Sequence, residues 1–294
     1  MGSVFVVGSI NRDYVCFVDR RPRAGETVTG ATLVTRHGGK GANQAAAAVE
    51  GGASVRLLAR VGADAAALAG RDDLTRRGVD VSPVRETAGV ATGAAFITVT
   101  PDGENAVVVA PGANGVLRES DVDAVAGLVS ESSVLVTQLE VPLDAVVRAV
   151  DLCGPTTHVL LNAAPWRPLP GSLLGRIDTL VVNEDEAAAL IGSAVDGVDG
   201  ARAGATRILA RGPGAVVVTL GADGVVVADA DGCTHVPAPR VRVVDTTGAG
   251  DVLVGWLAAL LADGRPLGRA AAIAVEKASA SVAFVGARSP LGTT

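Results

Sequence analysis

Apolar stretches of strand length alternate with longer helical patterns along almost all of the 294-residue chain. Patterns typical of buried strands occupy residues 4–8, 54–60, 134–138, 158–161, 179–182 and 215–220. Patterns typical of helices occupy residues 41–50, 65–77, 120–129, 143–152, 184–191, 202–211, 249–262 and 267–284. Such alternation predicts an α/β fold in which a mostly parallel sheet lies between two layers of helices, a three-layer αβα arrangement.

Two segments interrupt the alternation. Residues 12–36 contain strand-like pieces with no helix between them, and residues 91–110 place two β-branched stretches around a turn at Pro101, Asp102 and Gly103. Four short antiparallel strands outside the main sheet would form a small lid inserted into a single domain spanning residues 1–294. The alternative is that these strands extend the main sheet.

Composition excludes several classes of protein. The formal net charge is −6 and no stripe of basic residues is present, so nucleic acid is not an expected partner. No apolar stretch approaches the roughly 18 residues of a membrane span, and the first residues lack the basic segment of a signal peptide, which predicts a cytoplasmic protein. Three cysteines and three histidines are scattered, so we expect neither a disulfide nor a zinc site.

The most informative segment is the glycine-rich turn at residues 245–251, which precedes a predicted apolar helix. A helix that begins this way offers unpaired backbone N–H groups to an anion, and Gly248 and Gly250 would let a ligand approach the backbone. A carboxylate at Asp251 could accept the proton of an attacking hydroxyl during phosphoryl transfer. An ordinary acidic helix start explains the same residues.

A second glycine-rich turn, at residues 38–41, offers Lys40 and Asn43 at the start of another helix. It matches neither a Walker A loop nor the dinucleotide fingerprint GxGxxG. Hydrogen-bonding groups of this kind suit a polyhydroxylated ligand, although a solvated turn is the simpler explanation. Asn11, Asp13 and Glu140 follow predicted strands, where ligands of open α/β sheets bind.

Two further strand ends carry candidate nucleotide contacts. Three carboxylates follow Asn183 within residues 184–186 and could hold a hydrated Mg²⁺ beside phosphates, or could simply begin a helix. Residues 219–224 join two predicted strands and contain two glycines. This turn could admit a nucleotide close to the backbone or be a plain hairpin.

Taken together and in this order, these segments resemble the ribokinase-like (PfkB) sugar kinases over nearly the whole chain. The resemblance rests on six segments: Gly-Ser-Ile-Asn-x-Asp at 8–13, Gly-Gly-Lys-Gly-Ala-Asn-Gln at 38–44, Gln-Leu-Glu-x-Pro at 138–142, Asn-x-x-Glu at 183–186, Thr-Leu-Gly-x-x-Gly at 219–224 and Asp-Thr-Thr-Gly-Ala-Gly-Asp at 245–251.

The resemblance implies a role for each matching residue. Asp251 would be the catalytic base, with an anion hole formed by the backbone amides of Gly248, Ala249 and Gly250. The sugar would be held by Asn11, Asp13, Gly39, Lys40, Asn43 and Glu140. The nucleotide would contact Asn183, Thr219, Gly221, Gly224 and Gly250, with Mg²⁺ bound through water to Glu186. A monovalent cation, K⁺, would bind Asp245, the carbonyl of Thr247 and Gly286.

The resemblance also implies an activity and an assembly. The reaction would be ATP-dependent phosphorylation of a small sugar, ribose at its 5-hydroxyl, under a lid that also forms a homodimer contact. Family members with fructose, a nucleoside or a 2-keto-3-deoxy sugar acid as substrate remain alternatives, as do a non-catalytic sugar sensor and a Rossmann dehydrogenase. The segment after residue 281 is about two residues shorter than the family pattern, which bears on the K⁺ site.

Overall fold

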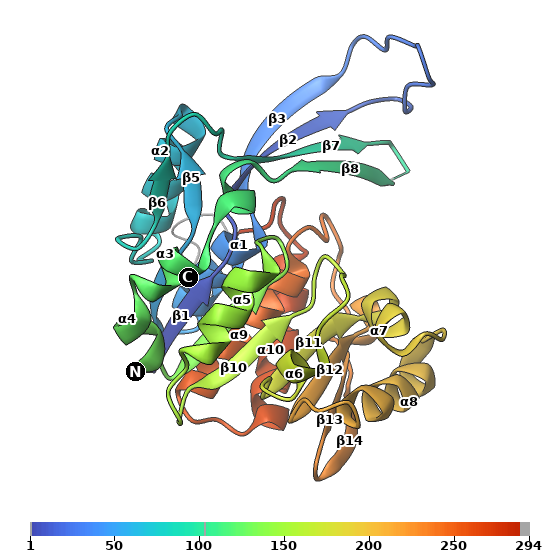
Figure 1. The fold of residues 1–294 in the computed structure, drawn as a ribbon. Coiled ribbons are helices and arrows are strands. Elements are labelled where there is room, and N and C mark those ends of the chain that lie inside the picture. The colour runs from blue at the N-terminus through green and yellow to red at the C-terminus, as the bar shows by residue number, and fades with distance from the viewer. Residues whose placement is uncertain (1, 103, 289–294) are drawn as a thin grey trace.

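The computed structural model describes residues 2–102 and 104–288, and an eight-stranded sheet forms the centre of its body (Figure 1). In spatial order the strands are β14 (Gly232–Val236), β13 (Val225–Asp229), β12 (Ala215–Thr219), β11 (Thr179–Asn183), β10 (His158–Asn162), β9 (Val134–Gln138), β1 (Ser3–Val7) and β4 (Ser54–Leu58). The six strands from β12 to β4 are parallel, and β13 and β14 continue the sheet as antiparallel strands. The predicted mostly parallel sheet is confirmed.

Two layers of helices cover the sheet, as the alternation predicts. The helices are α1 (Lys40–Glu50), α2 (Ala65–Arg76), α3 (Glu119–Asp123), α4 (Ala126–Ser130), α5 (Leu143–Asp151), α6 (Gly171–Leu174), α7 (Glu184–Ile191), α8 (Gly197–Leu209), α9 (Ala249–Ala262) and α10 (Leu267–Ser281). Short 3₁₀ turns lie at η1 (Gly112–Val116) and η2 (Gly221–Asp223).

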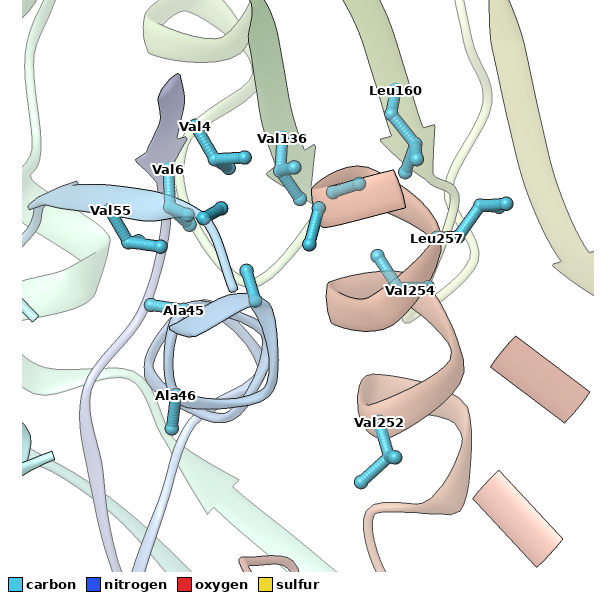
Figure 2. Packing of buried hydrophobic residues seen from close by; sticks show 14 of the residues in the cluster. Val4, Val6, Ala45, Ala46, Val55, Val136, Leu160, Val252, Val254 and Leu257 are labelled. Carbon is cyan, nitrogen blue, oxygen red and sulfur yellow. The ribbon is translucent and has the colours of Figure 1, made fainter. Parts of the chain in front are cut away.

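Alternate residues of each central strand enter different cores, which is the signature of a sheet buried on both faces. Val4 and Val6 of β1 pack with α1, α2, α9 and α10, whereas Phe5 and Val7 pack with helices α3 to α8 on the opposite face. Figure 2 shows the first core, where alanines of α1 and aliphatic side chains of α9 meet the valines of the sheet.

A separate four-stranded sheet, which we call the lid sheet, projects from one end of the body (Figure 1). Its order is β3 (Thr32–Gly38), β2 (Asn11–Phe17), β7 (Gly93–Val99) and β8 (Asn105–Ala110). Both hairpin pairs are antiparallel, as expected, while the central strands β2 and β7 run parallel. The strands therefore do not extend the main sheet.

Several element boundaries differ from the sequence prediction. The expected helix over 120–129 is divided into α3 and α4, because Val125 leaves the helical conformation at φ −124° and ψ 20°. The expected strand over 54–60 ends at Leu58, and Arg60 begins a separate strand, β5 (Arg60–Gly62), which pairs with β6 (Arg85–Thr87). Helix α8 begins five residues earlier than predicted, since its first turns contain glycines that weaken the helical pattern.

Within the described residues, no helix is both long and apolar enough to cross a membrane.

Candidate active site

The first turns of α1 and α9 lie side by side, and small residues make this possible. A Cβ atom at Gly255 of α9 would lie 2.5 Å from the carbonyl oxygen of Gln44 in α1. Gly39 precedes α1 with φ +89°, and a Cβ there would lie 2.7 Å from the backbone nitrogen of Asn11. The loop after β1 and the starts of two helices are thus brought together, as the predicted sugar site requires.

Asp251 lies in the first turn of α9 and is 6% exposed. The Nδ2 amide of Asn43 donates a hydrogen bond to its Oδ2 atom, and the Nε2 amide of Gln44 donates to its Oδ1 atom, both at 2.9 Å. Gln44 Nε2 also donates to Oδ1 of Asn162 at 3.1 Å. A carboxylate oxygen can accept about two hydrogen bonds, so each keeps capacity for a substrate hydroxyl.

Lys40 lies among carboxylates of three separate segments. The charge of Asp251 raises the pKa of the Lys40 ammonium, with further contributions from Glu140 and Glu186, although burial opposes the shift. The ammonium therefore stays charged at neutral pH. The structure thus brings the carboxylates of Asp251, Glu140 and Glu186 close enough to Lys40 for each to interact with its charge.

Glu140 lies just beyond β9, at the positive end of α1. Its Oε2 atom accepts a hydrogen bond from the backbone N–H of Lys40 at 2.9 Å and another from the hydroxyl of Ser9. Its Oε1 atom accepts none from residues 2–102 and 104–288. One oxygen thus holds the start of the helix and the other is available to a ligand.

Asn11 and Asp13 begin the first strand of the lid sheet. Asn11 Oδ1 accepts a hydrogen bond from Nδ2 of Asn114 at 2.7 Å. Asp13 Oδ1 is buried and has no hydrogen-bond partner in the described part of the chain. Burial, reinforced by the charge of Glu140, raises the pKa of Asp13 to about 6, and Arg288 and Arg36 offset this only in part. A buried acceptor without a partner suits a ligand hydroxyl.

If Asp13 accepts hydrogen bonds from the substrate, acid should weaken its binding. The carboxyl is ionised above pH 6 and protonated below it, so kcat/KM for the sugar should fall as the pH drops through 6. For a single proton we expect a loss of about tenfold at pH 5 relative to the plateau. Initial rates from pH 5 to 8 measure this, and an Asp13→Asn variant should lose the inflection. An unchanged profile in that variant would assign the inflection to another group.

The turn before α9 leaves backbone amides open. Gly248 has φ +79° and packs against Ala287, since a Cβ at this glycine would lie 2.5 Å from the Ala287 Cα. No side chain caps the helix. The sequence predicts three free N–H groups here, but that of Ala249 donates to the Thr246 carbonyl at 3.3 Å. The N–H groups of Gly248 and Gly250 have no partner among the described residues, and a Cβ at Gly250 would meet no atom within 4 Å.

A cavity of about 500 Å³ opens beside this turn. Thr219, Gly221, Gly224, Ala249 and Gly250 line it, together with aliphatic side chains from α9, α10 and the 238–243 segment. These five residues belong to the predicted nucleotide site and anion hole, and the aliphatic remainder of the lining suits a base. Asn183 pairs in register with Thr219 at the strand ends but is not among the lining residues.

A second cavity of about 380 Å³ lies between the lid sheet and the turn. Asp13 and the apolar side chains of Val15 and Phe17 line it from the lid, and Thr246 and Thr247 line it from the body. Both cavities share Val243 and Thr246. Of the predicted sugar-binding residues, Asp13 lines this second cavity, whereas Asn11, Gly39, Lys40, Asn43, Glu140 and Asp251 do not. The two cavities are adjacent and lie on the two sides of this turn.

Asn183 and Glu186 form the capping box that begins α7. Asn183 Oδ1 accepts from the N–H of Glu186 at 2.7 Å, and Glu186 Oε2 accepts from the N–H of Asn183 at 2.8 Å. Burial raises the pKa of Glu186. Its Oε1 atom makes no hydrogen bond to a described residue, so it fits a water ligand of Mg²⁺. No three His, Cys, Asp or Glu side chains of residues 2–102 and 104–288 cluster as a metal site, so the phosphates would have to supply ligands.

The side chain of Asp245 is already occupied. Its Oδ2 atom accepts hydrogen bonds at 2.9 Å from the Arg36 guanidinium of the lid sheet and from the N–H of Gly286. Its Oδ1 atom accepts from the N–H of Thr247, also at 2.9 Å. A cation at this carboxylate would meet a guanidinium and two N–H donors. The predicted K⁺ site does not fit this arrangement.

Several residues of the site were not predicted from the sequence. Gln44 belongs to a quoted motif but received no role, although it contacts Asp251 directly. Asn114, Asn162 and Arg288 belong to no motif, and each lies far along the chain from its partner. Only their polar character in apolar surroundings could have singled them out.

These features define a class of protein. A buried carboxylate beside a lysine, two adjacent cavities and open backbone amides at a helix start are the components that a phosphotransferase for a hydroxylated small molecule requires.

Comparisons with known proteins agree. The pfkB family carbohydrate kinase model matches residues 1–294, and the chain belongs to this family of carbohydrate kinases. It is 35% identical over 289 residues to a Haemophilus influenzae ribokinase, covering 98% of this chain and 94% of that one. It is 35% identical over 257 residues to a Salmonella typhimurium deoxyribokinase, covering 87% and 84%. An Arabidopsis thaliana ribokinase structure with ribose and ATP superposes with a TM-score of 0.88 at 28% identity, covering 98% and 95%.

Proposed function

We propose that this chain is an ATP-dependent ribokinase, which transfers the γ-phosphoryl group of ATP to the 5-hydroxyl of D-ribose and yields ribose 5-phosphate and ADP. The observation that carries the proposal is the placement of Asp251 between Asn43 and Gln44 of α1, one residue from the open amide of Gly250. The ribokinase relatives at about 35% identity support ribose as the substrate.

In this mechanism the main role of the chain is to position the sugar hydroxyl, the proposed base and the phosphoryl group relative to one another. Asp251 accepts the proton of the 5-hydroxyl, and the loose transition state makes its placement more important than its basicity. The N–H groups of Gly248 and Gly250 stabilise charge on the moving phosphoryl group at the positive end of α9. Mg²⁺ bound with ATP would neutralise phosphate charge, and Glu186 would hold it through water. The lid sheet would exclude water from the site.

The sugar would be held on the side of the lid sheet. Asp13 Oδ1 and Glu140 Oε1 are acceptors without a partner in the described chain, and Asn43 and Lys40 supply donors. In the nucleotide cavity, Thr219, Gly221 and Gly224 would contact ATP, and the aliphatic lining would take the adenine.

The alternative substrates place different demands on the sugar cavity. A nucleoside base would need aromatic side chains on both of its faces, but the described lining of this cavity offers only Phe17 and the imidazole of His37, and Tyr14 and Phe96 stack on each other at 5.3 Å. A sugar acid would need a free arginine, whereas Arg36 is bound to Asp245 and Arg12 donates to the hydroxyl of Thr35. Both observations favour a neutral sugar.

A substrate panel coupled to ADP formation tests the proposal. We expect kcat/KM for ribose to exceed that for fructose, adenosine and a 2-keto-3-deoxy sugar acid by at least about 10²-fold, a difference of about 3 kcal/mol in transition-state binding. 2-Deoxyribose belongs in the panel because of the deoxyribokinase relative. A preference for any other acceptor would overturn the assignment of ribose while leaving a kinase.

The Arg36–Asp245 ion pair predicts that turnover needs no K⁺ at this carboxylate. Both side chains are less than 20% exposed, so the guanidinium supplies a permanent charge where the family would place a cation. We expect kcat in NaCl and KCl to agree within about twofold. Arg36→Ala removes the positive charge from Asp245, leaves its two N–H donors in place, and should make both activity and melting temperature respond to K⁺. Arg12→Ala, on the same lid sheet, is the matched control. Strong K⁺ activation of the unmodified enzyme would contradict this prediction.

The outer face of the lid sheet supports a homodimer. This face carries three exposed apolar side chains: Leu33 at 58%, Phe96 at 52% and Val108 at 69%. A second copy of the chain could cover them. Val108→Glu should convert a dimer into a monomer in sedimentation experiments. Leu68→Glu on α2, where the native side chain is 71% exposed, is the control and should leave the mass unchanged. A monomeric unmodified protein would refute the dimer.

A further inference from the structure

Arg288 lies in the segment after α10, and its side chain contacts Asn43 at the carbonyl oxygen, while the amide nitrogen of Asn43 contacts Asp251. The Arg288 side chain is 5% exposed, yet all three guanidinium nitrogens are bonded. Nε donates to Oδ1 of Asn43 at 2.9 Å, Nη1 donates to Oδ2 of Asp73 at 2.5 Å, and Nη2 donates to the carbonyl of Gly38 at 3.1 Å. A buried guanidinium whose three nitrogens each donate a hydrogen bond is held in one orientation by the fold.

The positive charge of Arg288 is paired with the carboxylate of Asp73, which is not one of the proposed reacting groups. Asp73 of α2 is 7% exposed as a side chain and also binds Arg77 at 3.1 Å. Although burial opposes the shift, Arg288 and Arg77 hold the pKa of Asp73 below its ordinary value. Asp73 therefore keeps an ionic partner when either arginine is replaced, so loss of Arg288 leaves no unpaired buried carboxylate.

The bond to Asn43 determines what that residue presents to the site. Arginine can only donate, so the carbonyl oxygen of Asn43 must face Arg288 and the amide nitrogen must face Asp251. The carboxylate alone gives Asn43 one anchor, and Arg288 provides the second. The bond to Gly38 fixes the same guanidinium to the residue before Gly39, which is the N-cap of α1.

We propose that Arg288 is a positioning residue for phosphoryl transfer: it orients Asn43 and, through Asn43, holds the carboxylate of Asp251 toward the sugar hydroxyl. The proposal rests on the proposed role of Asp251 as the base. Misplacing a reacting group by about 1 Å can cost on the order of 10²-fold in rate. Arg288 touches no substrate in this arrangement, and its hydrogen-bonded route to Asp251 runs through Asn43, while its charge also lowers the pKa of Asp13.

Paired variants test the proposal. Arg288→Met removes the guanidinium and keeps an apolar stem, and Arg288→Lys keeps a charge for Asp73 without the planar donors that reach Asn43 and Gly38 together. Arg77→Met is the matched control because it removes the other arginine bound to Asp73 and leaves Asn43 untouched. We expect both Arg288 variants to lower kcat by about 30-fold with KM for ATP unchanged, and Arg77→Met to lower melting temperature only. Equal kinetic effects of Arg288→Met and Arg77→Met would overturn the proposal.

A double-mutant cycle with Asn43 separates positioning from general support. If Arg288 acts through Asn43, the Asn43→Ala/Arg288→Met variant should be no slower than Asn43→Ala alone. Multiplicative losses would overturn the proposal. An inactive Asp251→Asn enzyme together with a normal Arg288→Met enzyme would refute the positioning role alone, whereas an active Asp251→Asn enzyme would refute the proposed base.

Discussion

Asp251→Asn is expected to reduce kcat by about 10³-fold, the scale of losing a positioned general base. The substitution keeps the size of a side chain that is 6% exposed and removes its capacity to take up a proton. It also replaces one of two acceptor oxygens by a donor, facing either Asn43 or Gln44, both of which donate to the native carboxylate. Sugar affinity, measured by calorimetry without nucleotide, should change far less than turnover.

Asp263→Asn provides the control for this substitution. Asp263 follows the last turn of the same helix, α9, and its side chain is 55% exposed beside Arg265. An exposed pair of this kind contributes little to stability, so both kcat and melting temperature should stay near their unmodified values. Turnover by Asp251→Asn within about threefold of the unmodified enzyme would rule out the proposed base.

The layers of the fold could be predicted because a buried strand or helix shows a recognisable apolar pattern within its own short stretch of sequence. Strand β1 is apolar from Val4 to Val7 because both faces of the sheet are covered, α5 alternates apolar and charged residues as an amphipathic helix does, and α9 is almost entirely apolar after Asp251. No local sequence pattern indicates the parallel pairing of β2 with β7. It joins two segments about eighty residues apart and depends on how the two hairpins meet, which tertiary packing decides.

The site was predictable where a ligand-binding role shapes a short segment. The glycines before α1 and α9 and the carboxylates after the strands form local patterns, and the structure brings Lys40, Asn43 and Asp251 together. Their supporting contacts come from single residues elsewhere in the chain. Arg288 resembles any other arginine in the sequence, and Arg36 can be assigned to Asp245 only once the lid sheet lies against the turn.

The two glycines of the turn before α9 should fail in different ways when replaced by alanine. At Gly248 the backbone has φ +79° and a Cβ would lie 2.5 Å from Ala287, so Gly248→Ala should lower the melting temperature by at least about 3 °C. It should also lower kcat by at least about 10²-fold, because the amides of the turn would move. At Gly250 the φ is ordinary for alanine and the Cβ meets no protein atom within 4 Å.

Gly250→Ala therefore isolates the effect of the ligand. Its melting temperature without ligand should match that of the unmodified protein, as should that of the control Gly268→Ala at the start of α10, where a Cβ also meets nothing. Turnover should separate the two, since only at Gly250 would the added methyl group occupy the space in which the phosphoryl group must meet the backbone. We expect kcat/KM for ATP to fall by at least about 10²-fold in Gly250→Ala and to be unaffected in Gly268→Ala. Equal activity of the two variants would mean that the phosphoryl group does not approach this turn, and the anion hole would have to lie elsewhere.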